Sequence, residues 1–210
     1  VDGTTSFRAD VTGTVRNPEA RVQATGSNLT AFNEVLGTVE LRAGMSGRVV
    51  RVEELKLEKP QEDGNGLLRA SGTYNLDTHA YAMELSSKGV NFTQLTLPDG
   101  SAVRARGITA EAKGSGSMDD PALKLTVNAD SVAYRGQELG RIDGAVDVAS
   151  RQADIRLNAP KYSLAGSAQV GTQAPYAGTF ELTARDTQVQ NLPLPVGVEL
   201  TGTLTAAVKG

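Results

Sequence analysis

The stretch VTGTVRNPEARV, residues 11–22, decides the fold because its pattern returns 103 positions later. The later copy is KGSGSMDDPALKL, residues 113–125, in which Pro121 takes the place of Pro18. Self-similarity at a long, fixed period indicates a repeat protein, in which similar units stack along one axis and each contacts mainly its neighbours.

The repeat extends beyond this motif. The pair Leu36-Gly37 returns as Leu139-Gly140 at the same separation of 103 positions, whereas Gly72 and Gly166 are 94 positions apart. The loss of a few residues from one connecting turn accounts for the shorter spacing.

The repeat also predicts the domain organisation. Residues 1–104 form a first unit and residues 105–197 a second. A third unit is expected to start at residues 198–210, because TAEAKG at 109–114 returns as TAAVKG at 205–210. We therefore expect the chain to be a window of a longer array.

Apolar and polar residues alternate along almost the whole chain. Phe7, Ala9 and Val11 fall on one face of an extended segment, and Arg8 and Asp10 fall on the other. This period of two is typical of half-buried β-strands. More than half of the residues are therefore expected in strands, and no segment has the pattern of an amphipathic helix.

Short turn-forming clusters separate the expected strands, for example Asp63-Gly64 and Asp99-Gly100. Links this short indicate antiparallel neighbours, because parallel strands need a crossover of a dozen or more residues. The prediction is an all-β antiparallel meander of roughly 14 strands at ~4.8 Å spacing. Two less regular stretches, residues 27–35 and 129–139, are expected to hold a short helical turn or to leave the sheet.

A twisted sheet of this length must curl. If its apolar face turns inward, the sheet forms an open groove built from about two tandem repeats. The predicted groove lining consists of Val11, Val22, Val39, Leu41, Leu68, Met83, Leu85, Ile108, Leu123, Leu125, Val127, Ile142, Val146, Val148, Ile155, Leu157, Leu164, Phe180, Leu182, Leu200 and Leu204.

The same alternation fits a closed barrel or a sandwich whose interior its own side chains fill. The inward positions, however, include many small residues, such as Gly13, Ala70, Gly72, Ala112 and Gly178. Side chains of this size do not fill a wide interior, which favours the open groove.

No constellation of residues predicts catalysis, and we expect no catalytic, metal or cofactor site. His79 is the only histidine and follows Asp77-Thr78 in an expected turn, with no nucleophile motif beside it. Neighbouring acids such as Glu53-Glu54 point to opposite faces of a strand and do not face each other as glycosidase carboxylates do.

Composition excludes further classes. The net charge of −3 provides no basic surface for nucleic acid. With no Cys, the chain has neither disulfides nor thiolate metal sites. No apolar run approaches the ~20 residues that span a bilayer, so we expect any membrane anchor to lie outside this window.

These motifs together resemble the TamB and AsmA-like group of bacterial envelope proteins, with the TamB-like members the nearer in pattern. The resemblance covers nearly the whole chain. It is carried by Gly13-Thr14-Val15-Arg16-Asn17-Pro18, Gly114-Ser115-Gly116-Ser117 with Asp120-Pro121, Leu36-Gly37, Leu139-Gly140, and Ala70-Ser71-Gly72 with Leu164-Ala165-Gly166.

The resemblance implies a non-enzymatic conduit in the periplasm of a diderm bacterium, whose parent protein is anchored in the inner membrane. The implied partners are phospholipid acyl chains or nascent outer-membrane proteins, and envelope machinery bound through other parts of the parent. The alternative is a structural or adhesive stalk with a self-filled core and no cargo. In either case the strand-like ends of the chain predict edge-to-edge self-association.

Overall fold

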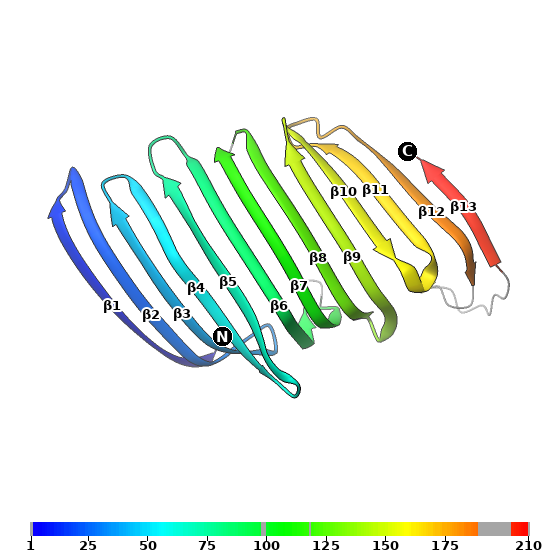
Figure 1. The fold of residues 1–210 in the computed structure, drawn as a ribbon, viewed down its shortest axis with the longest axis horizontal. Helices are drawn as coiled ribbons and strands as arrows, with labels where there is room; N and C mark the ends of the chain where they lie inside the picture. The colour runs from blue at the N-terminus through cyan, green and yellow to red at the C-terminus, as the bar shows by residue number, and fades with distance from the viewer. Residues whose placement is uncertain (1, 98–99, 118, 189–202, 210) are drawn as a thin grey trace.

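The computed structural model describes residues 2–97, 100–117, 119–188 and 203–209. It forms one sheet of 13 strands that follow one another in chain order, each antiparallel to the next (Figure 1). Strands hold 84% of the described residues. They are β1 Asp2–Thr14, β2 Asn17–Ala31, β3 Glu34–Ser46, β4 Val49–Gln61, β5 Gly64–Asn75, β6 Ala80–Thr96, β7 Ala102–Ser117, β8 Pro121–Tyr134, β9 Gln137–Ala149, β10 Gln152–Ala159, β11 Leu164–Gly171, β12 Gly178–Gln188 and β13 Thr203–Lys209.

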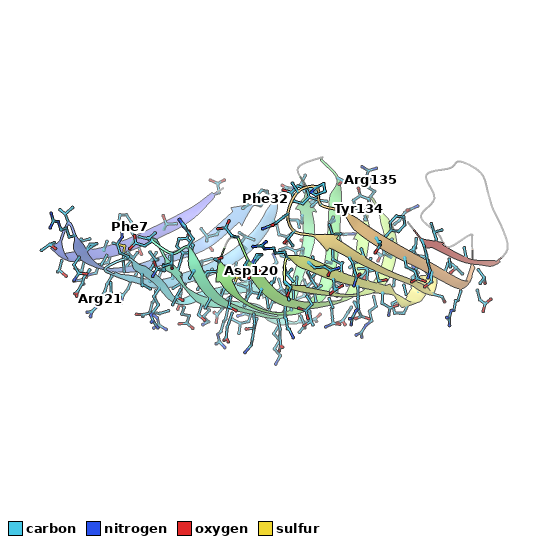
Figure 2. The ribbon with its side chains drawn as sticks, turned by 90° about the horizontal axis from the view of Figure 1, so that it is seen from above. Phe7, Arg21, Phe32, Asp120, Tyr134 and Arg135 are labelled. Atoms are coloured by element: carbon cyan, nitrogen blue, oxygen red, sulfur yellow. The ribbon has the colours of Figure 1, made fainter. Side chains whose placement is uncertain are left out.

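The sheet is not closed, because β1 and β13 lie at its two opposite ends. Viewed edge-on, the sheet bends into a trough, with Phe7 on the concave side and Arg21 on the convex side (Figure 2). This confirms the predicted all-β antiparallel meander and its open groove, and excludes a closed barrel.

The pairing register keeps apolar residues in rows that cross the sheet from strand to strand. Because directly opposed residues of antiparallel neighbours point to the same face, such a row is a continuous apolar band. The central row runs through Phe7, Ala24, Leu41, Leu55, Ala70, Leu85, Ala112, Leu125, Val146, Ile155, Ala168 and Phe180.

A β-bulge in β4 explains why there are 13 strands and not the 14 expected. Val52 pairs with Ala43 and Leu55 pairs with Leu41, so Glu53 is an extra residue in the strand. The bulge lets Val52 and Leu55 face the same side although their separation is odd. The two short strands that the alternation suggested around residues 50–57 are therefore one strand.

The repeated motif forms the same turn twice. Gly13 pairs with Pro18 at the end of the β1–β2 hairpin, and Gly116 pairs with Pro121 at the end of the β7–β8 hairpin. Both glycines have positive φ, +85° and +113°. The backbone therefore requires glycine at both places.

The expectation of a helical turn or excursion at residues 27–35 and 129–139 was wrong. Strand β2 continues to Ala31 and β8 to Tyr134, with irregular pairing that absorbs the broken alternation. A single 3₁₀ turn among the described residues, η1 at Pro160–Tyr162, lies elsewhere, between β10 and β11.

Replacing Gly116 with Ala is expected to lower the free energy of unfolding by about 1–3 kcal/mol, since a side chain at this φ is strained. The new Cβ would also lie 2.4 Å from the carbonyl oxygen of Asp120. The matched control is Gly166→Ala, whose Cβ would come no closer than 3.6 Å to another group. Urea denaturation of both variants checks this, and equal losses of stability would contradict it.

Candidate functional site

The concave apolar face, here called the trough, is the candidate site. The register places every described residue of the predicted lining on this face, including Ile108 opposite Val90 and Ile142 opposite Ala129. Leu200 lies outside the described residues. Leu204 pairs with Thr187 through its backbone, but its side chain also lies outside the described part.

Large side chains in the trough are open to solvent. Phe7 is 80% exposed, Leu157 52% and Phe180 51%. The buried apolar residues are mostly small, such as Ala112 and Ala184, which lie low between their larger neighbours. No element in the described part of the chain covers the trough, so a broad apolar surface faces water, as is typical of binding sites.

The convex face is polar and carries ion pairs between neighbouring strands. Glu84 and Lys113 are 3.1 Å apart, and Lys124 and Asp147 are 3.7 Å apart. These pairs are exposed and contribute little to stability. A hollow on this face is lined by the charged side chains of Glu84, Lys113 and Lys124, so the two faces of the sheet differ in chemistry.

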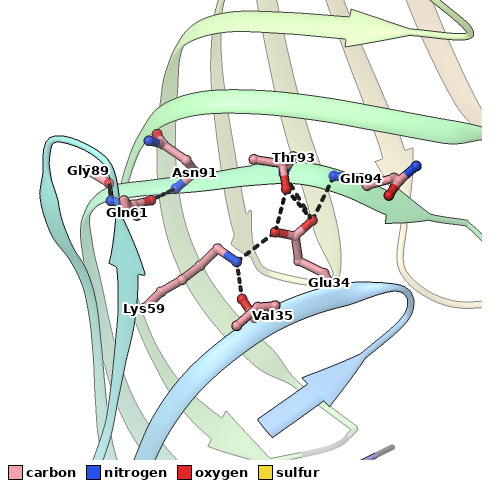
Figure 3. A network of polar contacts seen from close by, with 8 residues as sticks. All are labelled: Glu34, Val35, Lys59, Gln61, Gly89, Asn91, Thr93 and Gln94. Atoms are coloured by element: carbon pink, nitrogen blue, oxygen red, sulfur yellow. Dashed lines mark hydrogen bonds and ion pairs between the residues drawn. The ribbon is translucent and has the colours of Figure 1, made fainter. Parts of the chain in front are cut away.

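One rim of the trough is folded over and fixed by a buried carboxylate (Figure 3). Strand β6 is longer than β5, and its end passes the tip of the β4–β5 hairpin to reach the start of β3. There the Glu34 carboxylate, 2% exposed, accepts hydrogen bonds from the backbone N–H groups of Thr93, at 3.0 Å, and Gln94, at 2.7 Å. Glu34 thus connects two strands that are not neighbours in the sheet.

Lys59 of β4 completes this contact, which we call the rim pin. Its ammonium lies 2.6 Å from Glu34 Oε1 and also donates to the carbonyl oxygen of Val35. At 4% exposure, Lys59 is also buried. A buried charge is tolerated only when paired and hydrogen-bonded, and both charges of the pin meet that condition.

Side chains replace the missing sheet partner along the end of β6. Gln61 donates from Nε2 to the carbonyl oxygen of Gly89 at 2.7 Å and accepts from the backbone N–H of Asn91. The Asn91 side chain in turn accepts from the backbone N–H of Gly107 at 2.7 Å. The end of β6 therefore leaves the regular ladder without leaving these backbone groups unsatisfied.

The second repeat closes the same rim without a buried charge. Tyr162 donates to the carbonyl oxygen of Glu138 at 2.7 Å, and Lys161 donates to the same oxygen at 2.6 Å. Thr187 of β12 donates to the Tyr162 carbonyl oxygen at 2.6 Å. Lys59 contacts the carbonyl oxygen of Val35 in the first repeat. Glu138 lies 103 positions after Val35, which is the spacing of the sequence repeat, so the repeat could have predicted that the two rims correspond.

The pKa of Glu34 lies below its ordinary value. Burial alone would raise this pKa, but the hydrogen bond from Lys59, the backbone N–H of Gln94, the positive charge of Lys59 and the Thr93 hydroxyl together lower it. The carboxyl of the rim pin is therefore ionised at neutral pH.

The remaining candidate groups are ordinary surface residues. His79 lies in an exposed turn, where its Nδ1 is 2.8 Å from the hydroxyl of Tyr74. No group of three or more His, Asp or Glu residues that could hold a metal ion occurs in the described ranges. Likewise, within those ranges no helix has the length and apolarity needed to cross a membrane.

Comparison with family models, with curated proteins and with solved structures finds no match to this chain.

Replacing Glu34 with Gln is expected to lower the free energy of unfolding by about 1–3 kcal/mol, because the buried Lys59 ammonium loses its counter-charge. The control is Glu138→Gln, which removes an exposed carboxylate 3.2 Å from Arg104. That change is expected to cost less than about 0.5 kcal/mol. Urea denaturation at neutral pH measures the stability of both variants. A Glu34→Gln variant as stable as the control would show that the rim pin does not stabilise the fold.

The rim pin should also respond to acid. The pKa of the Glu34 carboxyl is lower in the folded chain than its ordinary value of 4.5. Its ionised form therefore stabilises the fold at any pH above 4.5, and this stabilisation is lost as the pH falls through the folded pKa. Hydrogen-exchange protection of the Thr93 and Gln94 amides should therefore hold from neutral pH to about pH 5 and fall at lower pH. The Arg185 amide bonds to the Ser163 carbonyl and serves as the reference. Parallel loss at all three amides would indicate global unfolding instead.

Proposed function

We propose that the trough is a segment of a periplasmic conduit that shields phospholipid acyl chains in transit between the inner and outer membranes. The observation that carries the proposal is the continuous apolar face, which nothing in the described chain covers. Acyl chains are the abundant envelope component whose transfer onto such a face removes apolar surface of both partners from water.

The dimensions of the trough support this cargo. Thirteen strands at ~4.8 Å spacing give a length on the order of 60 Å. Across the trough, the inward residues of β4 run from Val50 to Leu57, a span of roughly 23 Å at ~3.3 Å per residue. One leaflet of the hydrocarbon core is about 15 Å thick, so an acyl chain fits within that width.

The chemistry of the trough favours a cargo without a fixed sequence. The central row holds no polar side chain, and in the adjacent row the hydroxyl of Ser87 is satisfied by the carbonyl oxygen of Ile108 at 3.1 Å. Such a face offers dispersion and apolar burial but no hydrogen-bond selection, which suits interchangeable acyl chains better than the polar backbone of an outer-membrane protein strand.

A self-filled stalk accounts less well for the same face. A stalk needs its apolar side chains covered, whereas Leu157 and Phe180 remain about half exposed. The resemblance to the TamB and AsmA-like group supports the conduit and its place in the periplasm.

A charge placed in the trough should block the cargo more than it harms the fold. Val146 lies in the central row, so Val146→Glu is expected to remain folded and to lose at least about 90% of its crosslinking to a photoactivatable phospholipid, because the acyl chain would have to desolvate the carboxylate. Ala145→Glu is the matched control, since it adds the same charge to the convex face of β9 opposite Arg156.

Circular dichroism and urea denaturation report whether each variant folds. Unfolding of the Val146→Glu variant would indicate a filled core and support the stalk. Equal crosslinking in both variants would contradict the trough as the lipid site. Crosslinking of the wild-type chain to outer-membrane protein precursors in place of phospholipid would assign the trough to that cargo.

A further inference from the structure

The two long rims of the trough differ in packing. The turns after β3, β5 and β7 share one edge of the sheet, the upper edge in Figure 1, and the rim pin lies at the opposite edge. At the edge that holds the rim pin, Val90 is 4% exposed and Ala133 3%. At the other edge, Tyr74 and Tyr81 are half-buried and His79 is exposed. An occupant of the trough therefore meets a packed rim on one side and a solvated rim on the other.

Two tyrosines mark the solvated rim on the trough face. Tyr74 opposes Tyr81 in the next strand and Val50 in the preceding one. Because Val50 faces inward, both rings lie on the trough face. The Tyr81 ring covers Gly114, where an added Cβ would lie 3.3 Å from Tyr81 Cε2. Tyrosine is enriched where an apolar environment meets water, because its ring is apolar and its hydroxyl polar. We call this edge, with the turns after β3 and β5, the tyrosine rim.

Polar side chains stand beside the two tyrosines. The Arg48 Nε lies 2.8 Å from Asp77 Oδ1, and both side chains are more than half exposed. The two turns are joined here, because the Leu76 backbone N–H donates to the Arg48 carbonyl oxygen at 2.8 Å. His79 Nδ1 lies 2.8 Å from the Tyr74 hydroxyl. Since a guanidinium has five N–H donors, the terminal N–H groups of Arg48 can bind a phosphate while its Nε stays with Asp77.

The folded rim, in contrast, holds polar groups that are already paired. Glu34 and Lys59 bind each other, and the Lys59 ammonium lies 5.7 Å from the centroid of the Phe92 ring. Among the described residues, the only buried side-chain N or O atom without a hydrogen-bond partner is Thr172 Oγ1, in the turn after β11 at the other edge. A phosphate brought to the folded rim would lose water without gaining donors, whereas a hydrocarbon chain has no hydrogen bonds to lose.

We infer that a phospholipid lies across the trough in one direction, with its phosphate at the tyrosine rim beside Arg48 and its acyl chains running toward the folded rim. This inference rests on the proposed function and adds a direction to it. One leaflet of the hydrocarbon core is about 15 Å thick, and the residues of a strand advance ~3.3 Å each. Acyl chains that start at Tyr74 therefore pass Gly72 and end between Ala70 and Leu68.

Photo-crosslinking of the wild-type chain with two phosphatidylglycerol probes tests the direction. One probe carries a diazirine at the headgroup end of an acyl chain, and the other carries it at the terminal carbon. The first is expected to label mainly residues 72–74 and 81–83, which oppose each other in β5 and β6, and the second mainly residues 68–70 and 85–87. The reverse assignment, or equal labelling of both sets by both probes, would overturn the direction and leave the trough as the lipid site. If neither probe labels the trough, the proposed function fails as well.

Charge reversal tests the position of the phosphate. Arg48→Glu removes the phosphate donor of the tyrosine rim. The matched control is Arg104→Glu at the opposite edge, because Arg48 and Arg104 have side chains 58% and 57% exposed and Arg104 also pairs with a carboxylate, that of Glu138 at 3.2 Å. Each variant is crosslinked in a non-ionic detergent to phosphatidylglycerol and to diacylglycerol with the same acyl chains and diazirine. The ratio of phosphatidylglycerol to diacylglycerol crosslinking is expected to fall at least about threefold in Arg48→Glu and to keep its wild-type value in Arg104→Glu.

Diacylglycerol has the same acyl chains but no phosphate, so its crosslinking reports the trough alone. An unchanged ratio in Arg48→Glu, or an equal fall in both variants, would overturn the phosphate site. Circular dichroism shows whether each variant is folded. Arg48→Gln, which places no second carboxylate beside Asp77, is the alternative if Arg48→Glu does not fold, and a smaller fall in the same ratio is expected from it.

Discussion

The structure depends on one constraint, which is that the alternation of apolar and polar residues stays in phase across every pair of hydrogen-bonded strands. A slip of one residue would send the whole apolar set of a strand to the convex face. The bulge at Glu53 shows how the phase is kept, because one extra residue restores Leu55 to the side that Val52 occupies. The trough exists because no strand from β1 to β12 breaks this rule in the central row.

The molecule has no thick core, so its stability must come from contacts between neighbouring strands and from the folded rim. The buried apolar residues are mainly alanines beneath larger, half-exposed neighbours. In such a one-dimensional stack, each strand is held by the two beside it. The Glu34 carboxylate is different, because it ties β3 to β6 across two intervening strands and so holds the sheet in its bent form. The second repeat uses Tyr162 and Thr187 for the same purpose without an ion pair.

Local pattern predicted the strands, the antiparallel meander and the trough-facing residues, since alternation is a property of neighbours in the chain. The repeated Gly13 and Gly116 turns followed from the same motif. What could not be predicted depends on residues distant in sequence. Glu34 and Thr93 are 59 positions apart, and nothing in the local sequence around either indicates the other. The rim pin, the bulge and the 3₁₀ turn at Pro160 were therefore missed, and residues 27–35, where the pattern breaks at the start of the rim, were misassigned.

The central claim is that the trough is open to water in the protein alone and that acyl chains cover it when lipid binds. Thiol labelling tests this claim most directly. Single-cysteine variants Ile155→Cys, in the trough, and Arg156→Cys, on the convex face, are treated with a water-soluble maleimide, with and without vesicles of phosphatidylethanolamine and phosphatidylglycerol. The account predicts that both react readily without lipid, as the 38% exposure of Ile155 requires, and that lipid slows only the reaction at position 155. A cysteine at position 155 that is unreactive before lipid is added, or equally reactive afterwards, would contradict it.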